Sequence, residues 1–172
     1  QGVDLFAGQA RFSSPHDLEV VNLVNESQRV SGDNILIAVG TKPIRPTWVQ
    51  FDGETIFDSD ELLMRDRIPK SMIVVGGDVR SLEFAMSIAL LGTRVAVVDE
   101  RPRLLEFCDQ EVADQLRQQT ESHGVRFRLG RSVNAIEKAT DNRAVVRLAG
   151  GKNLLAECVL FASGRSGNTD AL

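Results

Sequence analysis

The stretch from Met72 to Glu100 constrains the fold more than any other part of the chain. It reads MIVVGGDVRSLEFAMSIALLGTRVAVVDE: an apolar run, a glycine pair, an amphipathic segment, a second apolar run and two acids. Its middle segment repeats apolar residues at the three- and four-residue spacing of a helix face, at Val79, Leu82, Ala85, Met86 and Ala89. The order predicts a strand, a tight turn, a helix that ends at Gly92, and a second buried strand.

The turn of this unit departs from the usual dinucleotide-binding pattern. GGDVRS stands where G-x-G-x-x-G is expected, so that Gly76 is kept while Asp78 and Ser81 replace the second and third glycines. A carboxylate beside a pyrophosphate is electrostatically unfavourable, although Asp78 can instead cap the helix and Arg80 can offer compensating charge. We therefore expect weakened or altered nucleotide binding on a retained fold.

An acid follows the second strand at the distance that a ribose-binding carboxylate requires. Asp99 lies 23 residues after Gly76, and the expected spacing is about 20 residues. Its carboxylate would accept hydrogen bonds from the adenosine ribose, which favours NAD. Arg101 and Arg103 lie close enough in sequence to bind a 2′-phosphate, so NADP remains an alternative ligand.

The rest of the chain alternates strand and turn signals around one further helix. Ser13–Asp17 predicts the turn of a hairpin spanning residues 10–24, with His16 as a loop residue. The run NILIAVG (34–40) predicts a buried parallel strand. Its terminal Gly40 either lets the backbone approach a ligand closely or simply ends the strand. We also expect a short helix over 60–64 capped by Asp58 or Ser59, a helix over 109–123 ended by Gly124, and strands at 125–129, 132–137, 144–148 and 154–162.

Composition excludes several classes of protein. A net charge of −4 and a pI near 5.2 give no basic surface for nucleic acid or an anionic membrane. No apolar run approaches the roughly 20 residues of a membrane span, and no signal peptide is visible, so we expect a cytoplasmic protein. Cys108 and Cys158 have neither metal-ligand nor redox spacing and are expected to be reduced structural thiols. Asp58, Asp60 and Glu61 are expected to form a helix start, and no metal site is predicted.

The order of these segments resembles the flavin-dependent pyridine nucleotide-disulfide oxidoreductase family. The chain is most similar to the soluble pyridine nucleotide transhydrogenases within that family. The resemblance spans the whole chain and rests on GQARF, ILIAVGTKPIRP, FDSDELL, IPKSMIVVGG, LEFA, RVAVVDERPRLLEFCDQEV and FASGRSGNTDAL.

The resemblance implies an α/β fold in which a Rossmann-like NAD(P)-binding domain, a parallel sheet with helices plus a β-meander, is inserted into a partial FAD-binding domain. It places a partial FAD segment at 1–45, a connector at 46–70, the NAD(P) domain at 71–166 and the return to the FAD domain at 167–172. It further implies a fragment. The remaining flavin domain and a C-terminal domain that forms a homodimer would lie outside these residues.

The resemblance also assigns site residues and cofactors. It implies contacts to FAD and NAD or NADP, with no catalytic residue in this chain, at Ala10, Val39, Gly40, Thr41, Gly76, Gly77, Asp78, Val79, Arg80, Ser81, Glu83, Asp99, Glu100, Val133 and Gly164. In the full enzyme, hydride would pass from one nicotinamide to the flavin and then to another nicotinamide. Two alternatives remain: a fragment resembling dihydrolipoamide dehydrogenase or a related disulfide reductase, and a degenerate, non-catalytic nucleotide-binding module.

Overall fold

The computed structural model describes residues 2–172, and these residues divide into two compact units. The larger unit is Pro43–Arg165, and the smaller contains the chain up to Lys42 together with Ser166–Leu172. No helix in residues 2–172 is long and apolar enough to cross a membrane.

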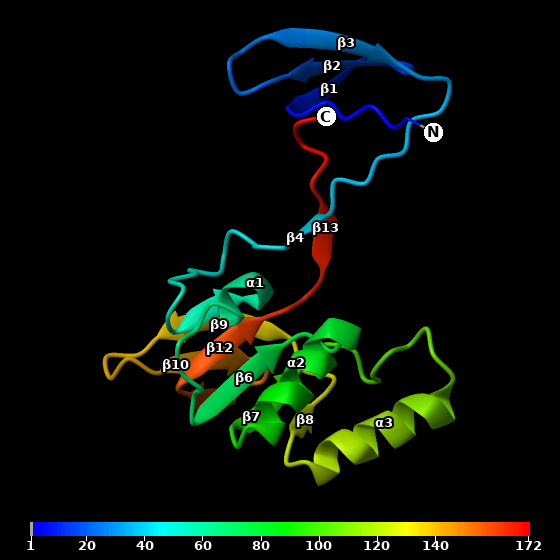
Figure 1. The fold of residues 1–172 in the computed structure, drawn as a ribbon. Coiled ribbons are helices and arrows are strands. Elements are labelled where there is room, and N and C mark those ends of the chain that lie inside the picture. Colours follow the sequence, from blue (N-terminus) through cyan, green and yellow to red (C-terminus); the bar gives the residue numbers. More distant parts are fainter. Residues whose placement is uncertain (1) are drawn as a thin grey trace. The chain divides into compact units, whose positions relative to one another are not determined.

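A five-stranded parallel sheet forms the centre of the larger unit (Figure 1). Its strands run in the order β5-β12-β6-β7-β8, so each crossover returns the chain to the same end of the sheet. The strands are β5 (Ile56–Asp58), β6 (Ser71–Val75), β7 (Arg94–Val98), β8 (Arg126–Arg128) and β12 (Cys158–Phe161). The strand β5 comes from the predicted connector, whose pattern showed no strand.

Two longer helices connect the central strands, and each begins at an aspartate. Helix α2 (Val79–Leu90) has Asp78 as its N-cap, and α3 (Gln110–Ser122) has Asp109. Gly92 and Gly124 follow the helix ends with positive φ, as predicted for helix terminators. Val79 does not join the predicted apolar face, since it is 47% exposed in the first turn of α2 while Leu82, Ala85 and Ala89 are buried.

A short helix, α1 (Ser59–Leu62), follows β5 and confirms the predicted acidic helix start. Asp58 is the cap: its side chain accepts hydrogen bonds from the backbone N–H groups of Asp60 and Glu61, while the Glu61 carboxylate accepts from Asp58 N. The Asp58 carboxylate also pairs with Arg45, and Asp60 pairs with Arg165. These acids therefore have structural partners.

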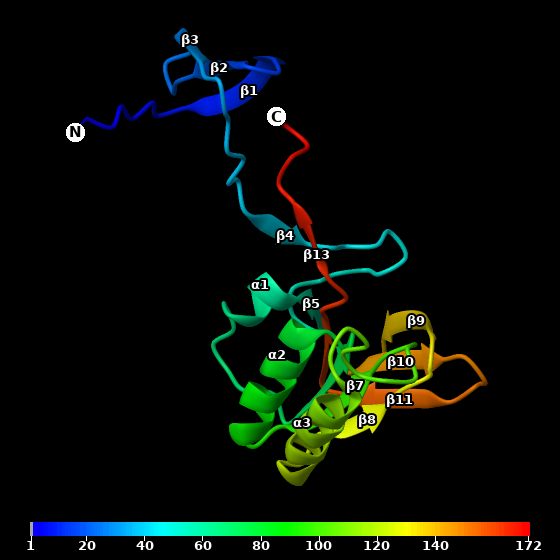
Figure 2. The same ribbon diagram turned by 90° about the vertical axis from the view of Figure 1, so that its right-hand side faces the viewer.

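The sheet is covered on both faces, as Figure 2 shows. On one face, Met72 and Val74 of β6 pack with residues of α2 and with Leu104 and Leu105. On the other face, Ile73 and Val75 pack against an antiparallel meander of β9 (Val133–Lys138), β10 (Ala144–Leu148) and β11 (Asn153–Ala156). Burial on both faces explains why the central strands are apolar without alternation.

The predicted strand over 154–162 is wrong as a single element. It divides at Glu157 into β11, which belongs to the meander, and β12, which belongs to the parallel sheet. The Glu157 carboxylate accepts a hydrogen bond from Lys70 N at 2.8 Å and pairs with Arg67 at 2.6 Å. These tertiary contacts fix the bend at Glu157 between the two sheets, and no local turn signal marks this bend.

The smaller unit holds a three-stranded antiparallel sheet of β1 (Gln9–Ser14), β2 (Asp17–Val21) and β3 (Ser27–Ser31). The predicted hairpin is confirmed, with Pro15 and His16 in its turn, and β3 adds a strand that the pattern did not show. Two further short strands, β4 (Thr41–Pro43) and β13 (Arg165–Gly167), pair with each other.

The predicted buried strand over 34–40 is wrong for this structure. These residues form no strand, and Leu36 is 90% exposed. A strand requires neighbours that satisfy its backbone groups, and among residues 2–172 the run has no such neighbour. The end of the run is held by two hydrogen bonds: Asn168 donates from its side chain to Val39 O and from its backbone to Gly40 O.

Both cysteines are free thiols, as predicted. Cys158 is fully buried in β12, and its burial raises the pKa of the thiol to about 12. Cys108 is half-buried beside the helix-side core. A protonated, buried thiol is a weak nucleophile, so Cys158 serves packing.

Candidate functional site

A cavity of about 470 Å³ lies at the carboxyl ends of β6, β7 and β12 in the larger unit. Ligands of open α/β sheets bind at this edge, because the loops that leave the strands diverge there. The cavity combines a glycine turn, charged groups and aromatic rings. Its lining residues are Trp48, Val75, Gly76, Gly77, Asp78, Val98, Asp99, Glu100, Arg101, Arg131, Val133, Phe161, Ser163 and Gly164.

The glycine pair brings the ends of three strands close together. Gly76 has a φ of +124° and donates its N–H to Val98 O at 2.8 Å. A Cβ on Gly76 would lie 2.7 Å from Ala162 O, and one on Gly77 would lie 2.8 Å from the Asp99 carboxylate. Neither position has room for a side chain, so the two glycines are required by packing at the site.

Asp78 caps α2, which confirms the cap interpretation of its place in the turn. Its Oδ1 accepts from Ser81 N at 2.8 Å. The Ser81 hydroxyl is shared between this Oδ1, at 2.6 Å, and Ala162 O, at 2.7 Å. Ser81 is fully buried, so its hydroxyl joins α2 to β12 at the place where the usual pattern has a glycine.

Asp99 ends β7 at the cavity and is paired with Arg101. Two side-chain hydrogen bonds join them, Arg101 Nε to Oδ1 at 2.8 Å and Nη2 to Oδ2 at 2.7 Å, and Arg101 N also donates to Oδ1 at 2.8 Å. Burial of the Asp99 carboxyl opposes ionisation, but the hydrogen bonds from Arg101 outweigh it and lower its pKa. The carboxylate is therefore ionised and held in a fixed fork.

Two aromatic side chains, Trp48 and Phe161, line the cavity and form its aromatic wall. Trp48 meets the ring of Phe161 edge to face, with 5.9 Å between ring centroids, and Phe51 meets Phe161 in the same way at 6.0 Å. Such pairs hold rings in a defined orientation. Trp48 is half-exposed and is the single tryptophan of the chain. Its place in the proline-rich segment gave no signal that it belonged to the site.

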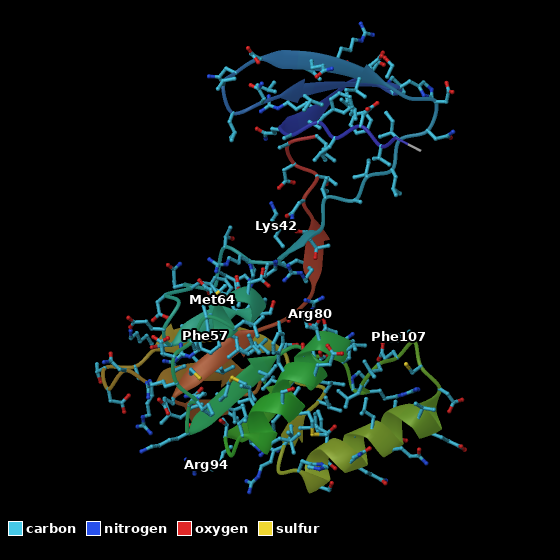
Figure 3. The ribbon with its side chains drawn as sticks, viewed as in Figure 1. Lys42, Phe57, Met64, Arg80, Arg94 and Phe107 are labelled. Carbon is cyan, nitrogen blue, oxygen red and sulfur yellow. The ribbon has the colours of Figure 1, made fainter. Side chains whose placement is uncertain are left out.

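The structure brings seven of the predicted site residues to this cavity. They are Gly76, Gly77, Asp78, Asp99, Glu100, Val133 and Gly164. Of the other predicted residues of α2, Ser81 is buried beneath the turn and Arg80 is exposed at the helix start (Figure 3). Val79 and Glu83 border a separate apolar cavity of about 400 Å³ at α2 and α3.

The predicted flavin contacts lie in the smaller unit, where Ala10 is half-buried and the other three residues are exposed. Ala10 pairs with Val20 across the β1–β2 ladder, Val39 and Gly40 lie on the extended segment, and Thr41 begins β4. Four residues of this kind cannot enclose a flavin. FAD therefore has only part of its site in this chain.

A larger cavity, of about 920 Å³, lies beside β5 and α1 and is lined by charged side chains. Most of its carboxylates already have partners: Arg45 binds Asp58 and Glu61 at 2.7 Å each, and Arg67 binds Glu157 at 2.6 Å. No cluster of residues within 2–172 has the ligands for a metal ion. The cavity at the sheet edge is the better candidate, because a helix N-terminus and a glycine turn converge on it.

The parallel sheet, the glycine turn and the capped helix at one sheet edge form the α/β arrangement that is typical of nucleotide-binding domains. Residues 1–172 match the pyridine nucleotide-disulphide oxidoreductase family, and the chain belongs to that family.

Two relatives illustrate the similarity in sequence. The chain is 43% identical over 171 residues to a soluble pyridine nucleotide transhydrogenase of Mycobacterium bovis BCG, covering 99% of this chain and 36% of the relative. It is 37% identical to the soluble pyridine nucleotide transhydrogenase of Photobacterium profundum, with 98% and 36% covered. The chain thus spans little more than a third of the curated relatives it matches.

Solved structures share the fold. The flavoprotein disulfide reductase RclA of Escherichia coli, induced by HOCl, superposes with a TM-score of 0.80 at 27% identity, covering 98% of this chain and 38% of RclA. LpdA of Mycobacterium tuberculosis superposes with a TM-score of 0.80 at 26% identity, covering 99% and 36%.

Proposed function

We propose that this chain supplies the pyridine-nucleotide site of an FAD-dependent oxidoreductase that transfers hydride between NADPH/NADP and NADH/NAD. The observation that carries the proposal is the cavity at the sheet edge, where Gly76, the N-terminus of α2 and Asp99 converge. The names of the transhydrogenase relatives support hydride transfer between two pyridine nucleotides as the type of reaction. We propose that FAD binds with the remaining flavin domain, that the longer protein is a homodimer, and that it is cytoplasmic. The relatives' name supports only that it is soluble.

The residues of the cavity suit the parts of a dinucleotide. The first turn of α2 and the glycine pair would hold the pyrophosphate, because backbone N–H groups and the helix dipole favour an anion there. The end of β7, with Arg101 bound to Asp99, would lie beside the adenosine ribose. Gly164 and the aromatic wall would border the nicotinamide end. The bound nucleotide supplies hydride chemistry, and these residues bind and orient it.

Trp48 offers a direct test, because the only tryptophan of the chain lines the cavity. Titration of the purified 172-residue chain with NADH or NADPH should give a saturable decrease of tryptophan emission, with energy transfer to the bound nicotinamide. A Trp48→Phe variant should lose this signal and still bind by calorimetry. A folded chain that binds neither nucleotide would contradict the proposed function and favour a degenerate, non-catalytic module.

Asp78→Asn is expected to tighten nucleotide binding about fivefold. Asparagine keeps the cap of α2, since it accepts from Ser81 N as aspartate does, while it removes a negative charge from the pyrophosphate end of the cavity. Removing repulsion of about 1 kcal/mol at a partly screened site corresponds to this factor. The measurement is the dissociation constant for NADPH by calorimetry.

The matched control for this variant is Asp109→Asn. Asp109 caps α3 through Glu111 N at 2.9 Å and does not line the cavity. Its replacement should leave the dissociation constant unchanged. Equal affinities for Asp78→Asn and the unaltered chain would show that the cap carboxylate does not weaken binding.

A disulfide reductase is the second candidate, and the superposition on RclA favours it. The nucleotide site would be the same in both enzymes, so the titrations do not separate them. The presence or absence of a C-x4-C pair in the sequence upstream of this chain would decide between them.

A further inference from the structure

Asp99 does not present an open carboxylate to the cavity. Its side chain is 6% exposed, whereas the Arg101 side chain that covers it is 39% exposed. Both carboxylate oxygens are bound by the guanidinium fork, and Oδ1 also accepts the backbone N–H of Arg101. Of the Asp99–Arg101 pair, the exposed partner is therefore the cation, although an acid occupies the sequence position.

A second arginine lines the same cavity. Arg131 N donates to Asp99 O at 3.0 Å, and Gly130 N donates to Arg101 O at 2.9 Å. These backbone bonds join the loop after β8 to the loop after β7 and bring Arg131 and Arg101 to one cavity. Arg131 is exposed and makes no ion pair with any residue in the described part of the chain.

The two arginines retain donors for a further anion. A guanidinium carries five N–H groups, and the fork to Asp99 uses one on Nε and one on Nη2 of Arg101. Three remain on Arg101, and Arg131 adds its own. Three acids line the cavity: Asp99, whose oxygens are held by Arg101, Asp78, whose carboxylate is bound to Ser81, and Glu100, which is exposed. A ribose hydroxyl needs an acceptor, whereas these arginines offer donors to a phosphate.

We infer that Asp99 is a positioning residue that holds Arg101, and that Arg101 and Arg131 together bind the 2′-phosphate of NADP(H). The cavity therefore takes NADPH in preference to NADH. This inference rests on the proposed function, since it names the nucleotide of the same site. It also reverses the simple expectation from Asp99, whose acid type favours NAD.

Asp99→Asn tests whether Asp99 binds the ribose or holds Arg101, because the two roles predict opposite changes in the ratio of NADPH to NADH affinity. If Asp99 accepts ribose hydroxyls, its neutralisation weakens NADH binding and relieves repulsion of the 2′-phosphate. If Asp99 holds Arg101, its neutralisation loosens the fork and weakens NADPH binding more than NADH binding. We expect the second result, with the ratio of NADPH to NADH affinity falling about fivefold.

Arg131→Gln tests the proposed 2′-phosphate contact without disturbing a buried group. Arg131 is exposed, so this variant should fold, and we expect NADPH affinity to fall about tenfold with NADH affinity nearly unchanged. Arg126→Gln is the matched control, because Arg126 is exposed and does not line the cavity. Adenosine 2′,5′-bisphosphate and AMP, compared by calorimetry on the same variants, isolate the contribution of the 2′-phosphate.

The outcomes distinguish this inference from the proposed function. Binding of NADPH about tenfold tighter than NADH, lost in Arg131→Gln and kept in Arg126→Gln, supports the inference. Tighter binding of NADH, or an unchanged affinity ratio in Arg131→Gln, overturns the inference and leaves the proposed function standing. Absence of binding by either nucleotide to a folded chain overturns both.

Discussion

Replacing Gly76 by alanine is expected to destabilise the larger unit by about 3 kcal/mol. Two effects add at this residue. Its φ of +124° is a conformation that residues with a Cβ rarely adopt. The added Cβ would also lie 2.7 Å from Ala162 O and 2.9 Å from Ser81 Oγ, so β12 or α2 must move. Urea unfolding followed by circular dichroism measures the change.

Gly124→Ala is the matched control for this prediction. Gly124 also has a positive φ, +92°, but a Cβ there would meet no atom within 4 Å. We expect it to destabilise by about 1 kcal/mol, the cost of the backbone conformation alone. The difference between the two variants isolates the close approach of the turn to β12. Equal destabilisation would show that this approach is loose.

Truncating Phe57 to alanine has the second large effect, a loss of about 4 kcal/mol. Phe57 lies on β5, is fully buried, and belongs to the core on the helix side of the sheet. The Arg65 guanidinium lies 4.6 Å from its ring centroid, so the variant also loses a cation–π contact. Thermal and urea unfolding should both report the loss.

Phe107→Ala supplies the comparison for the Phe57 variant. Phe107 is 76% exposed on the loop before α3, and Figure 3 labels both phenylalanines. Its truncation should change stability by less than about 0.5 kcal/mol. A small effect at Phe57 would mean that β5 is not part of the folded core, against the parallel pairing of β5 with β12.

Features of the site that depend on neighbours in sequence could be predicted from the sequence. The cap of α2 by Asp78 is one, because the capping carboxylate and the backbone N–H from which it accepts lie within three residues. The order of strand, turn, helix and strand from Met72 to Glu100 is another, because hydrophobic period and glycine position are local signals. The start of α3 at Asp109 could also be predicted, because Asp109 caps the helix through a neighbour in sequence.

Features that depend on distant partners could not be predicted. The run 34–40 has the composition of a buried strand, but only neighbouring strands make it one. Glu157 divides an apolar stretch between two sheets because Arg67 and Lys70 hold its carboxylate. Trp48 and Arg131 reach the cavity from separate loops, and no spacing rule relates them to Gly76.

Asp99 shows where the two kinds of information meet. Its position 23 residues after Gly76 follows from the sequence alone, since the length of the helix and strand between them places the acid at the sheet edge. Its chemical role does not, because that role depends on which group its carboxylate meets. The structure shows Arg101, two residues further along the chain, forked onto Asp99, and only the tertiary fold brings the distant Arg131 to the same cavity. The sequence thus determined the fold of the nucleotide unit through local periodicity and capping, whereas only packing decided which charges face the cavity.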